Sequence, residues 1–153
     1  MSQNSESWME AEKVFIGYNF CGAVHGTVIP QRLQNLCIRD YARGKGFNIT
    51  FSVSEYTDPQ RSLMLFAQFE FKDRVLSGFV FFSLLLLPID PVRRKEFYER
   101  ALAARHTVYF ALEDLSMSTA AEAAEMERLY RISVDQRLVT NRGTVLEYYG
   151  KTQ

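Results

Sequence analysis

Two neighbouring side chains, Glu55 and Tyr56, could support acid–base chemistry. A carboxylate can act as a general base, and a phenol can donate a hydrogen bond to a reacting oxygen. Glu113, with Asp114 beside it, could supply a second acid group. Structural alternatives stay open for each of them: Glu55 could cap a nearby helix, Tyr56 could lie at the edge of the core, and the two later acids could point into solvent.

Polar and basic side chains that could hold a substrate occur where strands are predicted to end and helices to begin. Exposed N–H groups and the dipole at a helix N-terminus favour a phosphate or a carboxylate. Arg93 and Arg94 open a helix, where positive charge opposes the dipole, and this placement favours contact with an anion. The candidate substrate-binding residues are Tyr18, Asn19, Gln31, Gln34, Arg61, Ser83, Arg93 and Arg94.

Common cofactor and nucleophile motifs are missing from the sequence. The segment GYNFCG, residues 17–22, lacks the GxGxxG spacing, and neither a GxxxxGKS/T loop nor a GxSxG elbow occurs. Only two histidines, His25 and His106, are present, so we expect no metal site and no cofactor. Cys21 and His25 could form a thiolate–imidazole pair, but an unreactive thiol is the commoner outcome. His106 is expected to be structural.

Short runs of β-branched and aromatic residues, bounded by turn residues, predict strands. These runs cover residues 13–20, 47–54, 78–87 and 106–112, with a less regular fifth run at 144–149. The apolar stretch within 78–87 is typical of a strand buried on both faces, and it is too short to cross a membrane.

Segments with helical periodicity lie between these strands. An acid followed by proline at 58–59 and again at 90–91 predicts the caps of the second and third helices, and Pro30 can open the first. A capping box at Thr119 predicts a fourth helix that ends near Thr140. The predicted buried stripes are Leu33, Leu36, Cys37 and Tyr41; Leu63, Phe66, Ala67 and Glu70; Phe97, Ala101 and Leu102; and Met126, Tyr130, Val134 and Leu138.

Strands that alternate with helices predict a three-layer α/β/α sandwich around a mostly parallel sheet of four or five strands. We expect one such domain over residues 13–150, preceded by a disordered tail at 1–12. In these sheets, ligands bind outside the carboxyl ends of the strands. The candidate residues should therefore meet in one crevice. A scatter over a flat surface would argue against an enzyme or a binding protein.

Charge and composition disfavour several classes of protein. The chain has 153 residues, of which 18 are basic and 18 acidic, so it lacks the net positive charge typical of nucleic-acid binding. The first residues are polar and acidic, unlike a secretory signal, and the two cysteines form neither a CxxC pair nor a disulfide framework. We expect a cytoplasmic protein with no nucleic-acid partner and no membrane insertion.

Several sequence blocks between residues 14 and 115 resemble a bacterial family, the sporadic carbohydrate cluster proteins. They are GYNF, VIPQRLQNLCIRDY, SVSEY, FFSLLLLP and YFALEDL, the most specific being Pro30–Gln31, Gln34–Asn35, IRDY at 38–41 and SEY at 54–56. Members are small proteins encoded in surface-polysaccharide and sugar-modification gene clusters. The resemblance implies a role in carbohydrate or nucleotide-sugar metabolism, without a defined reaction.

The same layout is similar to the catalytic domain of resolvase-type serine recombinases. Those proteins have a strand, a loop with a serine nucleophile, a glutamine-rich helix, and arginines after later strands. This resemblance implies a flavodoxin- or resolvase-like fold. Residues 17–29 contain no serine, however, and the turn after the third predicted strand has LLLLP instead of arginines. The departures disfavour recombination chemistry.

Three functional classes follow from these observations. The first is a cofactor-independent enzyme (isomerase, lyase or transferase) or binding protein for an anionic sugar or nucleotide sugar, with Glu55 and Tyr56 at the chemistry. The second is a non-catalytic subunit of a biosynthetic complex, whose fourth helix packs through its Met126-to-Leu138 stripe against another subunit, most simply in a homodimer. DNA strand transfer is the third and least favoured class.

Overall fold

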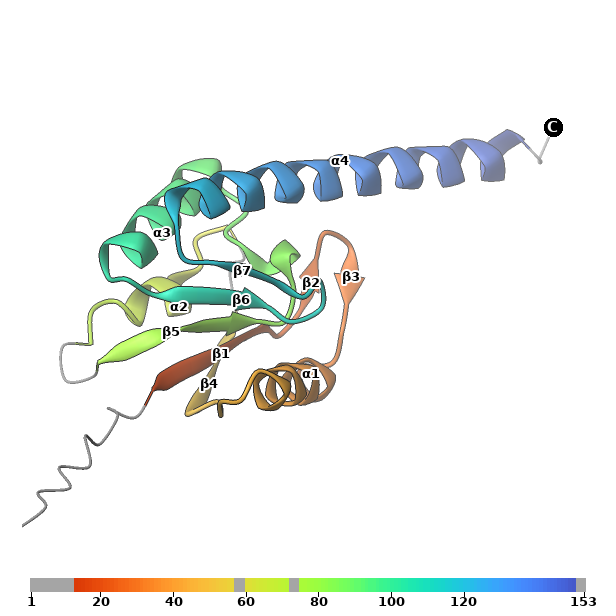
Figure 1. Ribbon diagram of the computed structural model, residues 1–153. Coiled ribbons are helices and arrows are strands. Elements are labelled where there is room, and N and C mark those ends of the chain that lie inside the picture. Colours follow the sequence, from red (N-terminus) through yellow and green to blue (C-terminus); the bar gives the residue numbers. More distant parts are fainter. Residues whose placement is uncertain (1–12, 57–59, 72–74, 151–153) are drawn as a thin grey trace, which may run out of the picture.

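A five-stranded sheet forms the centre of the computed structural model, which describes residues 13–56, 60–71 and 75–150, with side chains up to residue 137 (Figure 1). The strand order is β4-β1-β5-β6-β7. The first four of these strands are parallel, and β7 pairs antiparallel with β6 at the edge. The strands are β1 (Val14–Phe20), β4 (Phe51–Glu55), β5 (Leu76–Phe81), β6 (Thr107–Phe110) and β7 (Leu115–Met117).

Helices cover both faces of this sheet. Figure 1 shows α1 on one face and α3 with α4 over the other, so the predicted α/β fold with a mostly parallel sheet is confirmed. A small hairpin, β2 (Ala23–Val24) and β3 (Thr27–Val28), lies between β1 and α1. The helices are α1 (Gln31–Gly44), α2 (Leu63–Ala67), the 3-10 turn η1 (Leu84–Leu86), α3 (Pro91–Ala103) and α4 (Ala120–Gly150).

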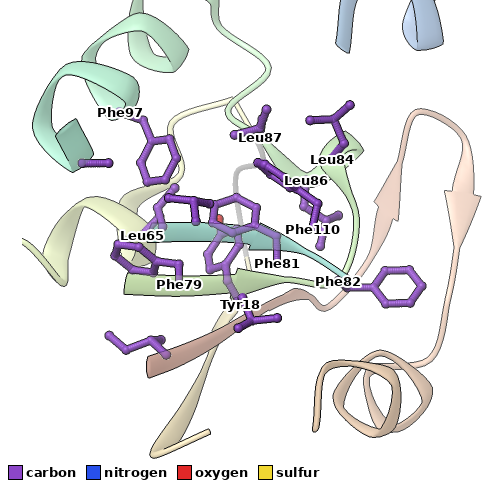
Figure 2. Close-up of a cluster of buried hydrophobic side chains, with 14 of the residues drawn as sticks. Tyr18, Leu65, Phe79, Phe81, Phe82, Leu84, Leu86, Leu87, Phe97 and Phe110 are labelled. Carbon is purple, nitrogen blue, oxygen red and sulfur yellow. The ribbon is translucent and has the colours of Figure 1, made fainter. Parts of the chain in front are cut away.

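Aromatic side chains fill the core between the sheet and α3. Phe79, Phe81 and Phe97 are fully buried, and Figure 2 shows the first two rising from β5 toward the third on α3. The ring centroids of Phe81 and Phe97 are 5.5 Å apart. Central strands of a parallel sheet are buried on both faces, which explains why their sequences are continuously apolar instead of alternating.

The face on which α1 packs differs from the prediction. Its buried residues are Gln34, Ile38 and Ala42, whereas Leu33 is 52% exposed and Leu36 is 55% exposed. Cys37 is exposed and Tyr41 is half-buried. The predicted stripe was wrong because it counted only apolar side chains, while the helix is rotated to bring the amide of Gln34 to the backbone at the end of β1.

The run predicted as one strand over 78–87 contains a strand and a turn. β5 ends at Phe81, and Ser83 caps η1 by accepting the N–H of Leu85 on its Oγ atom at 3.1 Å. Leu84 and Leu86 are buried in this turn. An unbroken apolar run shows burial but not the backbone geometry, so the boundary was not visible in the sequence.

Two predicted helix starts are confirmed. The carboxylate of Asp90 accepts the N–H of Val92 at 2.9 Å, and Pro91 occupies the first turn of α3. The N–H of Glu122 donates to Thr119 Oγ1 at 3.2 Å, which is the N-cap bond of a capping box, and the Glu122 carboxylate accepts from the Thr119 hydroxyl at 3.0 Å. The predicted cap at residues 58–59 and the predicted tail at 1–12 lie outside the described residues.

Two other predicted stretches adopt a different structure. α2 ends at Ala67 and buries Leu65 and Phe66, so the longer stripe from Leu63 to Glu70 was wrong. α4 continues to Gly150, so the predicted end near Thr140 and the fifth strand at 144–149 were also wrong. Asn and Gly are weak stop signals that a long helix tolerates at a cost of about 1 kcal/mol. Within the described part of the chain, no helix has both the length and the apolar composition to cross a bilayer.

Gly78 is required by the close pairing of β5 with β6. A Cβ atom at this position would lie 1.8 Å from the carbonyl oxygen of Thr107, whereas one at Gly44 would meet no atom within 4 Å. We therefore expect Gly78→Ala to lower the free energy of unfolding by about 3 kcal/mol or more. Gly44→Ala should raise it by about 0.5 kcal/mol, because alanine favours the helix. Urea denaturation followed by circular dichroism measures both, and equal stabilities would contradict this role of Gly78.

Candidate functional site

A closed polar network occupies the carboxyl end of β1. Asn19, which is fully buried, accepts hydrogen bonds on its Oδ1 atom from Ser54 Oγ at 2.6 Å and from Gln31 Nε2 at 3.2 Å. Its Nδ2 atom donates to Asn35 Oδ1 at 2.8 Å. These bonds connect β1, β4 and the first turns of α1. The predicted ligand contacts Asn19 and Gln31 thus lie together, and both have partners within the protein.

Gln34 holds α1 against the last residue of β1. Its Oε1 atom accepts the N–H of Phe20 at 3.1 Å, and its Nε2 atom donates to the carbonyl oxygens of Phe20 at 2.9 Å and Ile29 at 2.7 Å. The side chain is 2% exposed, and all its donors and its acceptor are engaged. The hydrogen bonds of Gln34 therefore hold α1 to the backbone of Phe20 and Ile29.

Glu55 and Tyr18 form a buried pair beneath α2. The hydroxyl of Tyr18 donates to Glu55 Oε2 at 2.9 Å, and the N–H of Met64 donates to both carboxylate oxygens at 3.1 Å. Burial, with the charge of Glu55, raises the pKa of Tyr18 well above its ordinary value, so the phenol remains a donor. These contacts agree with the structural alternative for Glu55, in which its carboxylate caps a nearby helix. Tyr56 is 65% exposed.

Ser83 and Glu113 form a second cluster at the ends of β5 and β6. The Ser83 hydroxyl donates to Glu113 Oε1 at 2.6 Å, and the N–H of Leu84 donates to Glu113 Oε2 at 3.0 Å. The neighbouring Asp114 instead accepts from Tyr41 and pairs with Lys45 at 3.1 Å. Both oxygens of Glu113 are thus used to hold η1.

The predicted anion-binding arginines have different surroundings. Arg94 is 3% exposed, forms two bonds to the Glu127 carboxylate at 2.6 and 2.9 Å, and lies over the ring of Tyr130 at 4.2 Å. Arg93 pairs with Glu96 at 3.2 Å, and its guanidinium lies over the Phe66 ring. Arg61 is exposed. Arg94 therefore joins α3 to α4 in the interior of the protein.

A pocket of about 470 Å³ opens beside the Ser83–Glu113 cluster. Its walls come from the β2–β3 hairpin, η1, the turn after β6, and α4. Glu113 is the one residue of the predicted catalytic and substrate-binding sets in its lining. The lining residues are His25, Gly26, Thr27, Leu85, Leu112, Glu113, Ser133, Gln136 and Arg137.

Two basic side chains define this pocket, which we call the His25–Arg137 pocket. Arg137 donates from Nη1 to Thr27 Oγ1 at 3.1 Å, and the Nε2 atom of His25 lies 3.2 Å from the hydroxyl of Tyr130. His25 has a left-handed backbone with φ of 49°, a conformation that non-glycine residues adopt rarely and often at functional sites. Sequence reasoning missed Arg137 because α4 brings it to the hairpin from more than a hundred positions away.

Two arginines act electrostatically on His25. Burial lowers the pKa of His25 below its ordinary value, and repulsion from Arg137 and Arg94 lowers it further. The imidazole is accordingly neutral at pH 7. A neutral imidazole beside a guanidinium can accept a proton from a substrate or donate a hydrogen bond to an anion.

Other residues that could do chemistry are placed apart from the pocket lining. Cys21 and Cys37 are free thiols, both exposed. His106 is 5% exposed and stacks on Phe69 with ring centroids 5.7 Å apart. Among the described residues, no three His, Cys, Asp or Glu side chains come together in a way that could hold a metal ion.

Comparisons with known proteins define the fold class. No family model matches the sequence, and no curated protein matches it. Among solved structures, the N-terminal catalytic domain of TP901-1 integrase is similar with a TM-score of 0.56 and 14% identity, over 83% of this chain and 98% of that chain. At this identity the similarity shows the fold alone. It confirms the resolvase-like α/β fold that the sequence resemblance implied.

The Arg94–Glu127 contact should decide whether α4 stays docked. The pKa of Glu127 lies below its ordinary value, because hydrogen bonds from Arg94 and Arg131 outweigh the opposing effect of burial. We expect Arg94→Met to lower the free energy of unfolding by about 2–3 kcal/mol, since it leaves a partly buried carboxylate with fewer donors. Arg93→Met, on the same helix with a half-exposed partner, should cost less than about 1 kcal/mol. Equal losses in urea denaturation would contradict this assignment.

Proposed function

We propose that the protein binds an anionic small molecule, a sugar phosphate or a nucleotide sugar, in the His25–Arg137 pocket. The observation that carries this proposal is the convergence of an imidazole and a guanidinium on a pocket of about 470 Å³ at the carboxyl ends of the strands. That volume lies within the range of small-molecule sites, and the carboxyl edge is where α/β sheets bind ligands.

Arg137 is the group that would hold the anion. A guanidinium presents several N–H donors in a plane, and it binds phosphate oxygens in pairs. One of those donors contacts Thr27, which fixes the side chain at the rim of the pocket. The negative charge of Glu113 is directed toward Ser83 and the N–H of Leu84, and both donate to it. Arg137 therefore supplies the charge for recognition.

A sugar as the neutral part of the ligand is supported by the resemblance to sporadic carbohydrate cluster proteins. Ser133 and Gln136 line the same pocket and are suited to sugar hydroxyl groups. If the protein is an enzyme, His25 is the group best placed for proton transfer. The reaction would then be a metal-independent isomerisation, elimination or transfer on a sugar of this class.

A non-catalytic role in a complex is the second candidate function. α4 has 31 residues and extends well beyond the sheet (Figure 1). Met126 and Tyr130 from the predicted contact stripe are each 4% exposed and pack into the protein's own core, and Leu138 lies beyond the described side chains. A homodimer would therefore use the projecting half of α4. Strand transfer on DNA remains the third candidate, with similarity in fold as its support.

Binding of defined probes tests the proposed ligand class. UDP-glucose and glucose 1-phosphate should raise the melting temperature of the protein and bind with a measurable heat in titration calorimetry. Arg137→Gln should weaken binding about tenfold or more, because it removes the charged donor. Arg128→Gln is the matched control, since Arg128 is also on α4 but pairs with Glu125 outside the pocket. No binding of either probe, or equal binding by the two variants, would contradict the proposal.

The affinity should also depend on pH through His25. A bound anion favours the imidazolium, so binding takes up a proton, and the affinity for UDP-glucose should rise as the pH falls from 7.5 through the lowered pKa of His25. The diphosphate of UDP-glucose does not itself titrate near pH 6, unlike a phosphate monoester. His25→Asn should abolish this dependence, and asparagine tolerates the left-handed backbone. If the affinity of the His25→Asn variant for UDP-glucose changes with pH as steeply as that of the unsubstituted protein, a group other than His25 titrates.

A further inference from the structure

A smaller recess adjoins the His25–Arg137 pocket. It has a volume of about 50 Å³ and lies between the end of β1, the β2–β3 hairpin and η1. The two cavities share Thr27, Leu85, Leu112 and Arg137, so a molecule held at the rim by Arg137 can reach into the recess.

The inner wall of the recess is apolar. It includes Phe20, Val24, Phe82 and Leu86, each less than a tenth exposed. Figure 2 shows the ring of Phe82 pointing away from the aromatic core, toward the side of β2 and α1. The recess therefore lies on the hairpin side of the hydrophobic core, to which its apolar wall belongs.

Two polar side chains of the same wall, Gln34 and Ser83, are already bonded within the protein, and the other two, Thr27 and Arg137, are shared with the larger pocket. Gln34 uses its amide on the backbone of Phe20 and Ile29, and Ser83 donates to Glu113 while accepting from Leu85. A hydroxyl group placed in the recess would lose water without gaining these partners. The volume is also well below that of a cavity that admits benzene, which is about 150 Å³.

We propose that the recess receives a methyl group of the ligand, such as the terminal methyl of the acetamido group of an N-acetylated sugar or the C6 methyl of a 6-deoxy sugar. The inference rests on the proposed function, because Arg137 must hold the anionic end for the substituent to enter. It identifies the substrate class more closely as acetylated or deoxygenated sugar nucleotides, in preference to their hydroxylated counterparts.

Matched pairs of ligands test this selectivity. We would measure the affinities of UDP-N-acetylglucosamine against UDP-glucose, and of dTDP-6-deoxyglucose against dTDP-glucose, by titration calorimetry with the full chain. Burial of one methyl group is worth about fourfold in affinity, and exclusion of an unpaired hydroxyl adds to this. The methyl-bearing member should therefore bind about tenfold more tightly in at least one pair. Equal affinities within both pairs would overturn the inference.

Variants separate the recess from the anion site. Gly22 lines the recess, and a Cβ there would meet no atom within 4 Å, so Gly22→Leu adds an apolar side chain at the recess wall without a clash at that position. Leu112→Ser makes its wall polar at a residue that is 60% exposed. Both variants should bring the affinity ratio close to one, and an unchanged ratio in both would overturn the inference. Arg137→Gln should weaken the binding of both members of a pair, because it removes the group that holds the anion. Failure of every probe to bind would instead overturn the proposed function.

Discussion

The position of α4 depends on the buried contact between Arg94 and Glu127. The guanidinium donates to Glu127 and to the carbonyl oxygens of Pro88 and Ile89 at 3.0 Å, so it joins the start of α3, the loop before it and α4 at one point. Tyr98 also donates to Glu127, and the Tyr130 ring lies against the arginine. Since α4 carries the outer wall of the pocket, the geometry of the candidate site follows from this ionic contact.

The carboxyl edge of the sheet shows why polar residues at strand ends do not by themselves identify a site. Parallel strands and helix N-termini leave backbone donors at this edge that must be satisfied. Glu55 bonds to the N–H of Met64, Glu113 to that of Leu84, and Gln34 to the backbone of Phe20. Polar side chains that hold the architecture and those that hold a ligand therefore occur at the same positions in the sequence.

Local features of the fold were predictable from sequence, whereas features set by distant contacts were not. The caps at Asp90 and Thr119 depend on residues two or three positions apart, and both were predicted correctly. The rotation of α1 depends on Gln34 meeting β1, and the pocket depends on Arg137 meeting Thr27. Hydrophobic periodicity along the sequence carries no information on such contacts between distant residues. The alternation of strands and helices was enough to predict the α/β fold and its mostly parallel sheet.

The hydrogen bonds at this edge also show which acidic groups hold the architecture. Glu55 and Glu113 each accept hydrogen bonds from a hydroxyl and a backbone N–H, and these bonds hold α2 and η1 in place. His25 has no such structural cap to maintain, and its contact with Tyr130 can be made by either tautomer. Protonation of the imidazole near a bound anion is thus compatible with an intact fold.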